Sequence, residues 1–313
     1  MGRERLLDLL KVSLSLALLA LLLKQVGWQQ TLETLRGAKF PYLAAAFVLY
    51  LVGIVVRAYR WQVLLNALRM DIPLARLTAL YFIGTFFSNF LPTGIGGDVV
   101  RVYELSKQSK RPIESVGTVL LDRATGLLVL FLIALVALLF SYQLIAPDVA
   151  AAILLLCLGS WAGLGLVLKQ DWLERWGLLR IMDKIKQLRE LYESVTACGL
   201  KAIGGALAIS LVFNVFLIAV NYLIAVSLGV EIPLWYFLLF IPLISFLLVL
   251  PISLSGLGIR EGGYVYLFAQ AGVSAPLALA MSLLFYALNV ATGLIGGVLY
   301  VLKGVRGYVE DRG

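Results

Sequence analysis

Long apolar stretches dominate this chain of 313 residues and constrain its fold more than any other feature. A helix of about 20 residues crosses the ~30 Å hydrocarbon core of a bilayer. Only 14% of the residues are charged and 61% are hydrophobic, a composition that excludes a soluble enzyme, a disordered chain and a nucleic-acid-binding domain. The sequence therefore predicts an all-α polytopic membrane protein. Its six expected spans are 6–23, 41–62, 113–140, 149–168, 202–228 and 276–302.

Two further apolar stretches are too short or too broken to cross a membrane. One ends at Pro92 and the other at Pro251, and a glycine-rich break follows each proline. Non-helical backbone at membrane depth is tolerated only where protein or a water-filled cavity surrounds it. We therefore interpret each stretch as a re-entrant hairpin that enters and leaves on the same side. The four short helices are expected at 77–91, 99–107, 234–250 and 261–271.

The distribution of basic residues predicts the orientation in the membrane. If the N-terminus is cytoplasmic, 21 of the 26 Lys and Arg residues belong to cytoplasmic segments, and Arg123 falls inside a span. The positive-inside rule then places both termini in the cytoplasm, with the chain in the plasma membrane. The basic residues of the outer segments are Lys24, Arg36, Lys39 and Arg260.

The two halves of the chain resemble each other in sequence. Each half carries an acidic-Ile-Pro-Leu segment, then a Leu-Pro pair, then the glycine-rich break, and finally a Leu-x-x-Ala-Thr-Gly-Leu segment at 121–127 or 288–294. Because span 41–62 starts outside and span 202–228 starts inside, the repeats are inverted. Inverted repeats with broken helices are typical of alternating-access transporters. The single transmembrane domain 1–313 then contains repeat one at about 41–140, an amphipathic cytoplasmic linker at about 171–195 and repeat two at about 202–302.

The first glycine-rich break is the most informative segment. Successive amides in such a loop form an anion-binding concavity, and a helix starting near Val99 would point its positive end there. Asp98 is expected to cap that helix, and Arg101 lies one turn further on. The alternative is that these two side chains only cap the helix and pair with each other. The candidate residues here are Asn89, Pro92, Gly94, Gly96, Gly97, Asp98 and Arg101.

The second break repeats this arrangement, with an opposite-charge pair at the start of a helix. Its candidate residues are Pro251, Gly256, Gly258, Arg260 and Glu261. A further pair, Asp122 and Arg123, lies about 16 Å along the span that begins after Pro112, near the middle of the membrane. Charged residues at that depth are functional candidates, and the alternative for Arg123 is a structural ion pair with the first hairpin. Arg57, Arg60 and Arg69 are interpreted as residues that flank the second span on its cytoplasmic side.

The residue types also restrict the chemistry. The chain has no histidine, and its two cysteines, Cys157 and Cys198, are interpreted as buried apolar residues. We therefore expect no metal and no cofactor. The phosphate-binding pattern GxxxxGK[ST] does not occur, which excludes ATP as the protein's own energy source.

The segments Ser88–Arg101 and Pro251–Gly262 resemble the two signature stretches of the flippase-like transmembrane family. This family is the membrane domain of lysylphosphatidylglycerol synthase and also occurs as stand-alone proteins. The resemblance covers roughly 10–300. It implies lipid translocation, and we expect the chain to be the flippase-like part without the aminoacyltransferase domain that follows in bifunctional members.

Three functions are compatible with these observations. The first is a translocase, not an enzyme, that moves a lipid with an anionic or zwitterionic head group between leaflets. The second is a membrane partner subunit of a lipid-modifying synthase or glycosyltransferase that transports nothing itself. The third is an intramembrane aspartyl protease that uses Asp98 and Asp122. None of these functions involves nucleic acid.

Overall fold

The computed structural model describes residues 26 and 28–310, except 91–95, 169–184 and 250–255. These residues form helices joined by turns, and no strand occurs among them. The all-α fold expected from the sequence is therefore confirmed.

Five described helices are long and apolar enough to span a membrane. They correspond to five of the six expected spans, and the sixth, 6–23, lies outside the described residues. Proline occupies the first or second position in four of them, where its missing N–H removes no helical hydrogen bond. The long helices are α3 (Phe40–Ala67), α6 (Pro112–Ser141), α7 (Pro147–Leu168), α11 (Gly199–Ser227) and α14 (Ala275–Glu310).

Four shorter helices form two pairs, each interrupted at one of the breaks. Their bounds agree with the expected segments to within about three residues at each end. They are α4 (Leu74–Phe90) with α5 (Gly96–Ser109), and α12 (Leu234–Val249) with α13 (Ile259–Ala269). The remaining elements are α2 (Trp28–Arg36), the 3₁₀ turn η1 (Tyr142–Leu144) and α10 (Lys186–Ala197).

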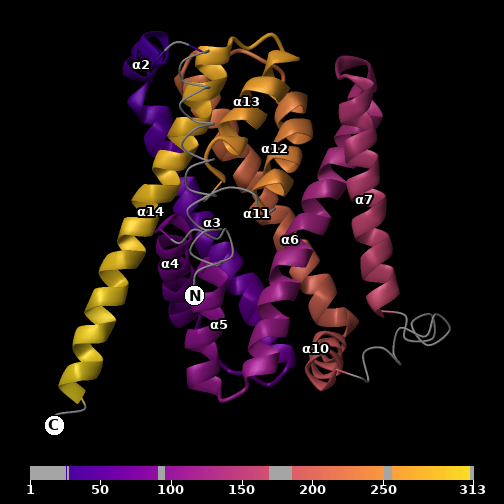
Figure 1. Ribbon diagram of the computed structural model, residues 1–313, viewed down its shortest axis with the longest axis vertical. Helices are drawn as coiled ribbons and strands as arrows, with labels where there is room; N and C mark the ends of the chain where they lie inside the picture. Colours follow the sequence, from indigo (N-terminus) through magenta and orange to yellow (C-terminus); the bar gives the residue numbers. More distant parts are fainter. Residues whose placement is uncertain (1–25, 27, 91–95, 169–184, 250–255, 311–313) are drawn as a thin grey trace, which may run out of the picture.

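The packing of the helices joins corresponding elements of the two halves of the chain. Helices α3 and α11, which begin the two repeats, pack extensively against each other. Helix α14 packs on α4, and in the same way α6 packs on α12, so the last helix of each repeat covers the short pair of the other. The α4–α5 pair and the α12–α13 pair lie toward opposite ends of the bundle (Figure 1).

Glycine allows the closest of these helix contacts. A Cβ atom built on Gly97 of α5 would collide with the carbonyl oxygen of Gly84 of α4. A Cβ atom on Gly296 of α14 would collide with the carbonyl oxygen of Phe82 of the same short helix. Small residues at membrane helix interfaces let backbones approach closely, and van der Waals packing drives association there because lipid tails are as apolar as the side chains. These glycines therefore set the position of α4 between α5 and α14.

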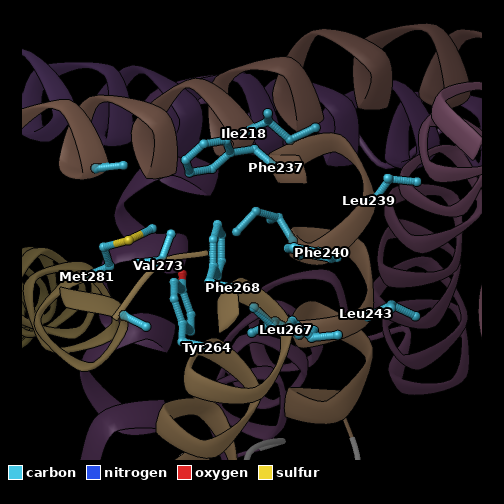
Figure 2. Packing of buried hydrophobic residues seen from close by; sticks show 14 of the residues in the cluster. Ile218, Phe237, Leu239, Phe240, Leu243, Tyr264, Leu267, Phe268, Val273 and Met281 are labelled. Carbon is cyan, nitrogen blue, oxygen red and sulfur yellow. The ribbon is translucent and has the colours of Figure 1, made fainter. Parts of the chain in front are cut away.

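An aromatic cluster holds the second short pair in place (Figure 2). Phe268 of α13 lies with its ring centroid 5.2 Å from that of Phe237 and 5.4 Å from that of Phe240, both on α12. Tyr264 of α13 stacks on Phe268 at 5.5 Å. Ile218 of α11 belongs to the same buried cluster. This packing holds α13, the helix that carries the predicted charge pair of the second half, against α12.

The expected amphipathic linker is described only in its last part, where α10 forms. Tyr192 and Ser194 of α10 are buried, and the helix packs on α6. Cys198, directly after α10, is also buried, and burial raises the pKa of its thiol to about 11. The thiol is therefore protonated at neutral pH, in agreement with its interpretation as a packing residue.

Candidate functional site

Asp122 is the centre of a buried network of charged side chains. It lies on α6, is 0% exposed, and accepts hydrogen bonds from Arg60 Nε of α3 at 2.8 Å and from Arg101 Nη2 of α5 at 3.1 Å. The hydroxyl of Tyr81 on α4 donates to Asp122 Oδ2, the oxygen that also accepts from Arg101. Arg60 also donates through Nη1 to Ser210 Oγ of α11 at 2.9 Å, which extends the network into the second half of the chain.

Asp98 is the second carboxylate of the network. It accepts a hydrogen bond from Arg101 Nη1 at 3.2 Å and forms an ion pair with Arg123. Arg101 therefore bridges Asp98 and Asp122. The expectation that Asp98 caps a helix starting near Val99 is wrong, because α5 begins at Gly96 and Asp98 already lies within its first turn.

Aromatic rings support the arginines of this network. The guanidinium carbon of Arg101 lies 3.7 Å from the ring centroid of Tyr81 and 4.2 Å from that of Trp61. The guanidinium carbon of Arg57 lies 4.7 Å from Tyr81 and 5.2 Å from Phe213. Such cation–π contacts stabilise a guanidinium group where water is absent.

The network carries an excess of positive charge. Arg57, Arg60, Arg101 and Arg123 face two aspartates, Asp98 and Asp122, so two positive charges have no counterpart among the described residues that line the site. The described side chains therefore leave the site with a net positive charge. An uncompensated charge away from water is costly.

Two cavities adjoin this network. The larger, of about 310 Å³, lies between α3, α6, α11, α12 and α14, and the smaller, of about 110 Å³, lies between α3, α4, α5, α6 and α14. The site therefore lies where the two halves of the chain meet. The residues that line both cavities are Tyr50, Arg57, Arg123 and Asn289.

The structure brings most of the described candidates from the first break together at this site. Gly97, Asp98 and Arg101 line the smaller cavity with Arg123. Gly96 is buried at the start of α5, and Asn89 Nδ2 donates to the carbonyl oxygen of Asn289 at 3.3 Å, which links the two halves. Two other candidates, Pro92 and Gly94, lie outside the described residues.

The candidates of the second half form a separate, charge-balanced pair. Arg260 and Glu261 are 3% and 0% exposed, their Nη2 and Oε1 atoms lie 2.5 Å apart, and neither lines the two cavities. Glu261 Oε2 accepts from the backbone N–H of Gly258 at 2.6 Å, so this acid does cap its helix. Gly256 and Gly258 have φ of 79° and 81°, a conformation that glycine adopts readily. Pro251 lies outside the described residues.

Arg123 forms the ion pair with the first short pair that was expected from the sequence as the alternative to a functional role. Its ion-pair partner is Asp98 of the first short pair rather than its neighbour Asp122. Adjacent helical residues point about 100° apart, so the two side chains reach different partners. Arg123 is both an ion-pair residue and a lining residue of the two cavities.

Several residues of the site were not identified from the sequence, among them Arg57, Arg60, Tyr81 and Asn289. Arg57 and Arg60 were interpreted as flanking residues because they lie near the cytoplasmic end of the expected span 41–62. In the structure both side chains line the larger cavity, and Arg60 pairs with Asp122. Tyr81 gave no charge signal. A usable signal was the polar stripe Tyr81, Thr85 and Ser88, which recurs every three or four residues on the apolar helix α4 and lines the smaller cavity.

Apolar spanning helices around a buried, positively charged site define this chain as a polytopic α-helical membrane protein. Comparison with known families then identifies it more closely. The chain belongs to the family described as the lysylphosphatidylglycerol synthase TM region, whose model matches residues 9–297. The resemblance noted from the two signature stretches is thereby confirmed.

Similar proteins carry names that state no activity. Two UPF0104 membrane proteins of Methanothermobacter thermautotrophicus are each 24% identical to this chain; one alignment covers 84% of this chain and 85% of the relative, the other 88% of each. A UPF0104 membrane protein of Pyrococcus horikoshii is 25% identical over 48% of this chain and 44% of its own length. No solved structure matches the chain significantly.

Proposed function

We propose that this protein is a lipid translocase of the plasma membrane, with both termini in the cytoplasm. It moves a phospholipid or another phosphate-bearing lipid between leaflets by alternating access and performs no enzymatic step. The observation that carries this proposal is the cavity between the two halves, where four arginines face two carboxylates. A lipid phosphate would neutralise part of that excess while it crosses the apolar region.

Arginine suits this role chemically. Its planar guanidinium group can hold two phosphate oxygens at once and stays charged at any physiological pH. Arg123 lines both cavities and lies inside a continuous spanning helix, so a crossing head group would meet it at depth. The family to which the chain belongs agrees with a lipid as the substrate.

The two short helix pairs supply elements that could alternate. In this proposal α4–α5 and α12–α13 are re-entrant hairpins at opposite membrane faces. Each packs against the last helix of the other repeat, so a movement of one repeat changes access to the site from one side.

The geometry does not favour an aspartyl protease. Catalysis of that type needs two carboxylates that share a proton. Here Arg101 lies between Asp98 and Asp122 and donates to both, and each carboxylate has a further arginine partner. Arginine N–H groups therefore lie between the two carboxylates, and this geometry leaves no proton for them to share.

Reconstitution into liposomes tests the proposal. A fluorescent phosphatidylglycerol in the inner leaflet becomes accessible to an external quencher only if it is translocated. Wild-type protein is expected to speed this exchange, Arg123→Lys to do so poorly and Arg123→Gln hardly at all. Arg76→Gln is the matched control, because Arg76 pairs with Glu104 at 3.4 Å and lines neither cavity.

The translocase would be refuted if wild-type protein exchanged lipids no faster than protein-free liposomes do. This result would have to hold for phosphatidylglycerol, phosphatidylethanolamine and phosphatidylcholine alike. The partner-subunit reading would then be preferred.

A further inference from the structure

We infer that Arg57 and Asn289 form the head-group subsite of this protein, and that the subsite selects a phosphodiester with a neighbouring hydrogen-bond donor, such as a hydroxyl or an ammonium group. This inference rests on the proposed function, because it names the substrate class of the same site. The two residues come from opposite halves of the chain, α3 and α14, and both line the two cavities.

Arg57 differs from the other three arginines of the site. Arg60, Arg101 and Arg123 each form an ion pair with a carboxylate. Arg57 has no ion pair with any described residue, and its Nε is buried without a hydrogen-bond partner among them. Of the four arginines, Arg57 is therefore the one that has no carboxylate partner among the described residues.

The surroundings of Arg57 keep its guanidinium group in place without neutralising it. The group lies over the rings of Tyr81 and Phe213, at 4.7 and 5.2 Å from their centroids. Contact with ring faces leaves the N–H groups at the edge of the guanidinium plane free to donate. Two phosphate oxygens are the acceptors that match this edge.

Asn289 supplies the complementary group. Its Oδ1 is buried and has no hydrogen-bond partner among the described residues. A buried acceptor requires a donor, and a phosphodiester has none at neutral pH. A ligand that satisfies both Arg57 and Asn289 therefore carries a donor beside its phosphate.

The sequence repeat explains why no carboxylate neutralises Arg57 in this subsite. Asn289 occupies the position in repeat two that Asp122 occupies in repeat one. The carboxylate of Asp122 holds Arg60 and Arg101 in closed ion pairs. An amide at the matching position carries no charge, so it does not neutralise Arg57.

The two cavities suit different parts of a lipid, the smaller a polar part and the larger an apolar part. The smaller cavity is lined by Thr85 and Ser88, whereas the larger includes Leu127, Leu130 and Phe216. Arg57 and Asn289 belong to both linings. This arrangement places a phosphate at the junction, a polar head in the smaller cavity and the glycerol end of the acyl chains in the larger.

Calorimetric titration of the purified full-length protein in detergent tests the subsite. The probes are dihexanoyl phosphatidylglycerol, phosphatidylethanolamine and phosphatidylcholine, together with inorganic phosphate. Phosphatidylglycerol and phosphatidylethanolamine are expected to bind more tightly than phosphatidylcholine, whose quaternary ammonium has no N–H. Arg57→Gln should weaken phosphatidylglycerol binding about tenfold to a hundredfold, the range for a lost charge-assisted hydrogen bond, and Arg57→Lys should weaken it less. Arg76→Gln should leave it unchanged.

Asn289 variants test the donor requirement separately. Asn289→Leu should remove the preference for phosphatidylglycerol over phosphatidylcholine. Asn289→Asp should weaken all three lipids, because the new carboxylate competes with phosphate for Arg57. Thermal unfolding of each variant shows whether it is folded. If Arg57→Gln is not folded, the binding measurements on Arg57→Lys and on the Asn289 variants test the subsite instead.

Three results would overturn the inference. They are wild-type affinity for phosphatidylglycerol in a folded Arg57→Gln, equal affinity of wild-type protein for phosphatidylglycerol and phosphatidylcholine, and inorganic phosphate binding as tightly as the lipids. Failure of the proposed function looks different. Selective binding without translocation would refute the proposal of a translocase but leave the proposed subsite supported. Translocation at the wild-type rate by Arg57→Gln would refute the proposed subsite but leave the translocase supported.

Discussion

Asp122→Asn should be among the most destabilising single changes in this protein. Asp122 is fully buried, pairs with Arg60 at 2.8 Å and with Arg101 at 3.1 Å, and accepts from Tyr81. Asparagine keeps the shape of the side chain but removes the charge. Two arginines then lose a counter-charge, and Arg101 keeps only Asp98.

The size of the effect follows from burial. Removing one partner of a buried ion pair costs about 3–5 kcal/mol because the remaining charge is left uncompensated. With about 2–4 °C of melting temperature per kcal/mol for a chain of this size, the expected decrease is about 6–20 °C.

Thermal unfolding in detergent, followed by tryptophan fluorescence, measures this decrease. Glu104→Gln is the matched control, because Glu104 pairs with Arg76 at 3.4 Å in a partly exposed position, where an ion pair contributes about 1 kcal/mol or less. The double variant Asp122→Asn with Arg60→Gln should recover part of the loss, because it also removes one of the uncompensated charges. If Asp122→Asn unfolds at the same temperature as Glu104→Gln, the network does not hold α3, α4 and α5 to α6, and the reasoning fails.

Two further predictions concern the short helices. Gly97→Val should abolish translocation and lower the folding stability by about 1–3 kcal/mol, since a side chain there collides with Gly84 and forces α5 away from α4. Gly163→Val is the control, because a Cβ atom at Gly163 meets nothing within 4 Å. Normal transport by Gly97→Val would refute this role. In a background without the native cysteines, Gln108→Cys should react with an impermeant thiol reagent from the cytoplasmic side and Ser274→Cys from the outside. Labelling of both from one side would contradict the inverted topology.

The two halves of the chain contribute different numbers of charged residues to the site, although their sequences correspond. In the first half, a carboxylate on α6 gathers arginines from α3 and α5. In the second half, Arg260 and Glu261 neutralise each other within α13, and the counterpart of Asp122 is the neutral Asn289. The positive charge that has no carboxylate counterpart among the described residues therefore comes from the first repeat. The second repeat contributes mostly apolar lining residues of the cavity and the amide of Asn289.

The sequence by itself determined the class of fold and the limits of most helices. A length of about 20 apolar residues is a local property, because every backbone N–H and C=O in a bilayer must be satisfied within its own helix. Prolines and glycines mark the breaks for the same local reason, and the bounds of α4, α5, α12 and α13 were predictable from them. The candidates Asp98, Arg101, Asp122 and Arg123 were also visible, since charges are rare in such segments.

Only the tertiary structure decided which charges face each other. Arg60 and Asp122 are 62 residues apart, and their pairing depends on how α3 packs on α6. The same holds for Arg57 and Asn289, which are far apart in sequence and line the same two cavities because α3 and α14 lie side by side there. Charge balance is a property of a cavity and not of a segment. For that reason a residue such as Arg57, which the sequence places at the edge of a span, becomes in the folded protein the arginine that has no carboxylate among the described residues.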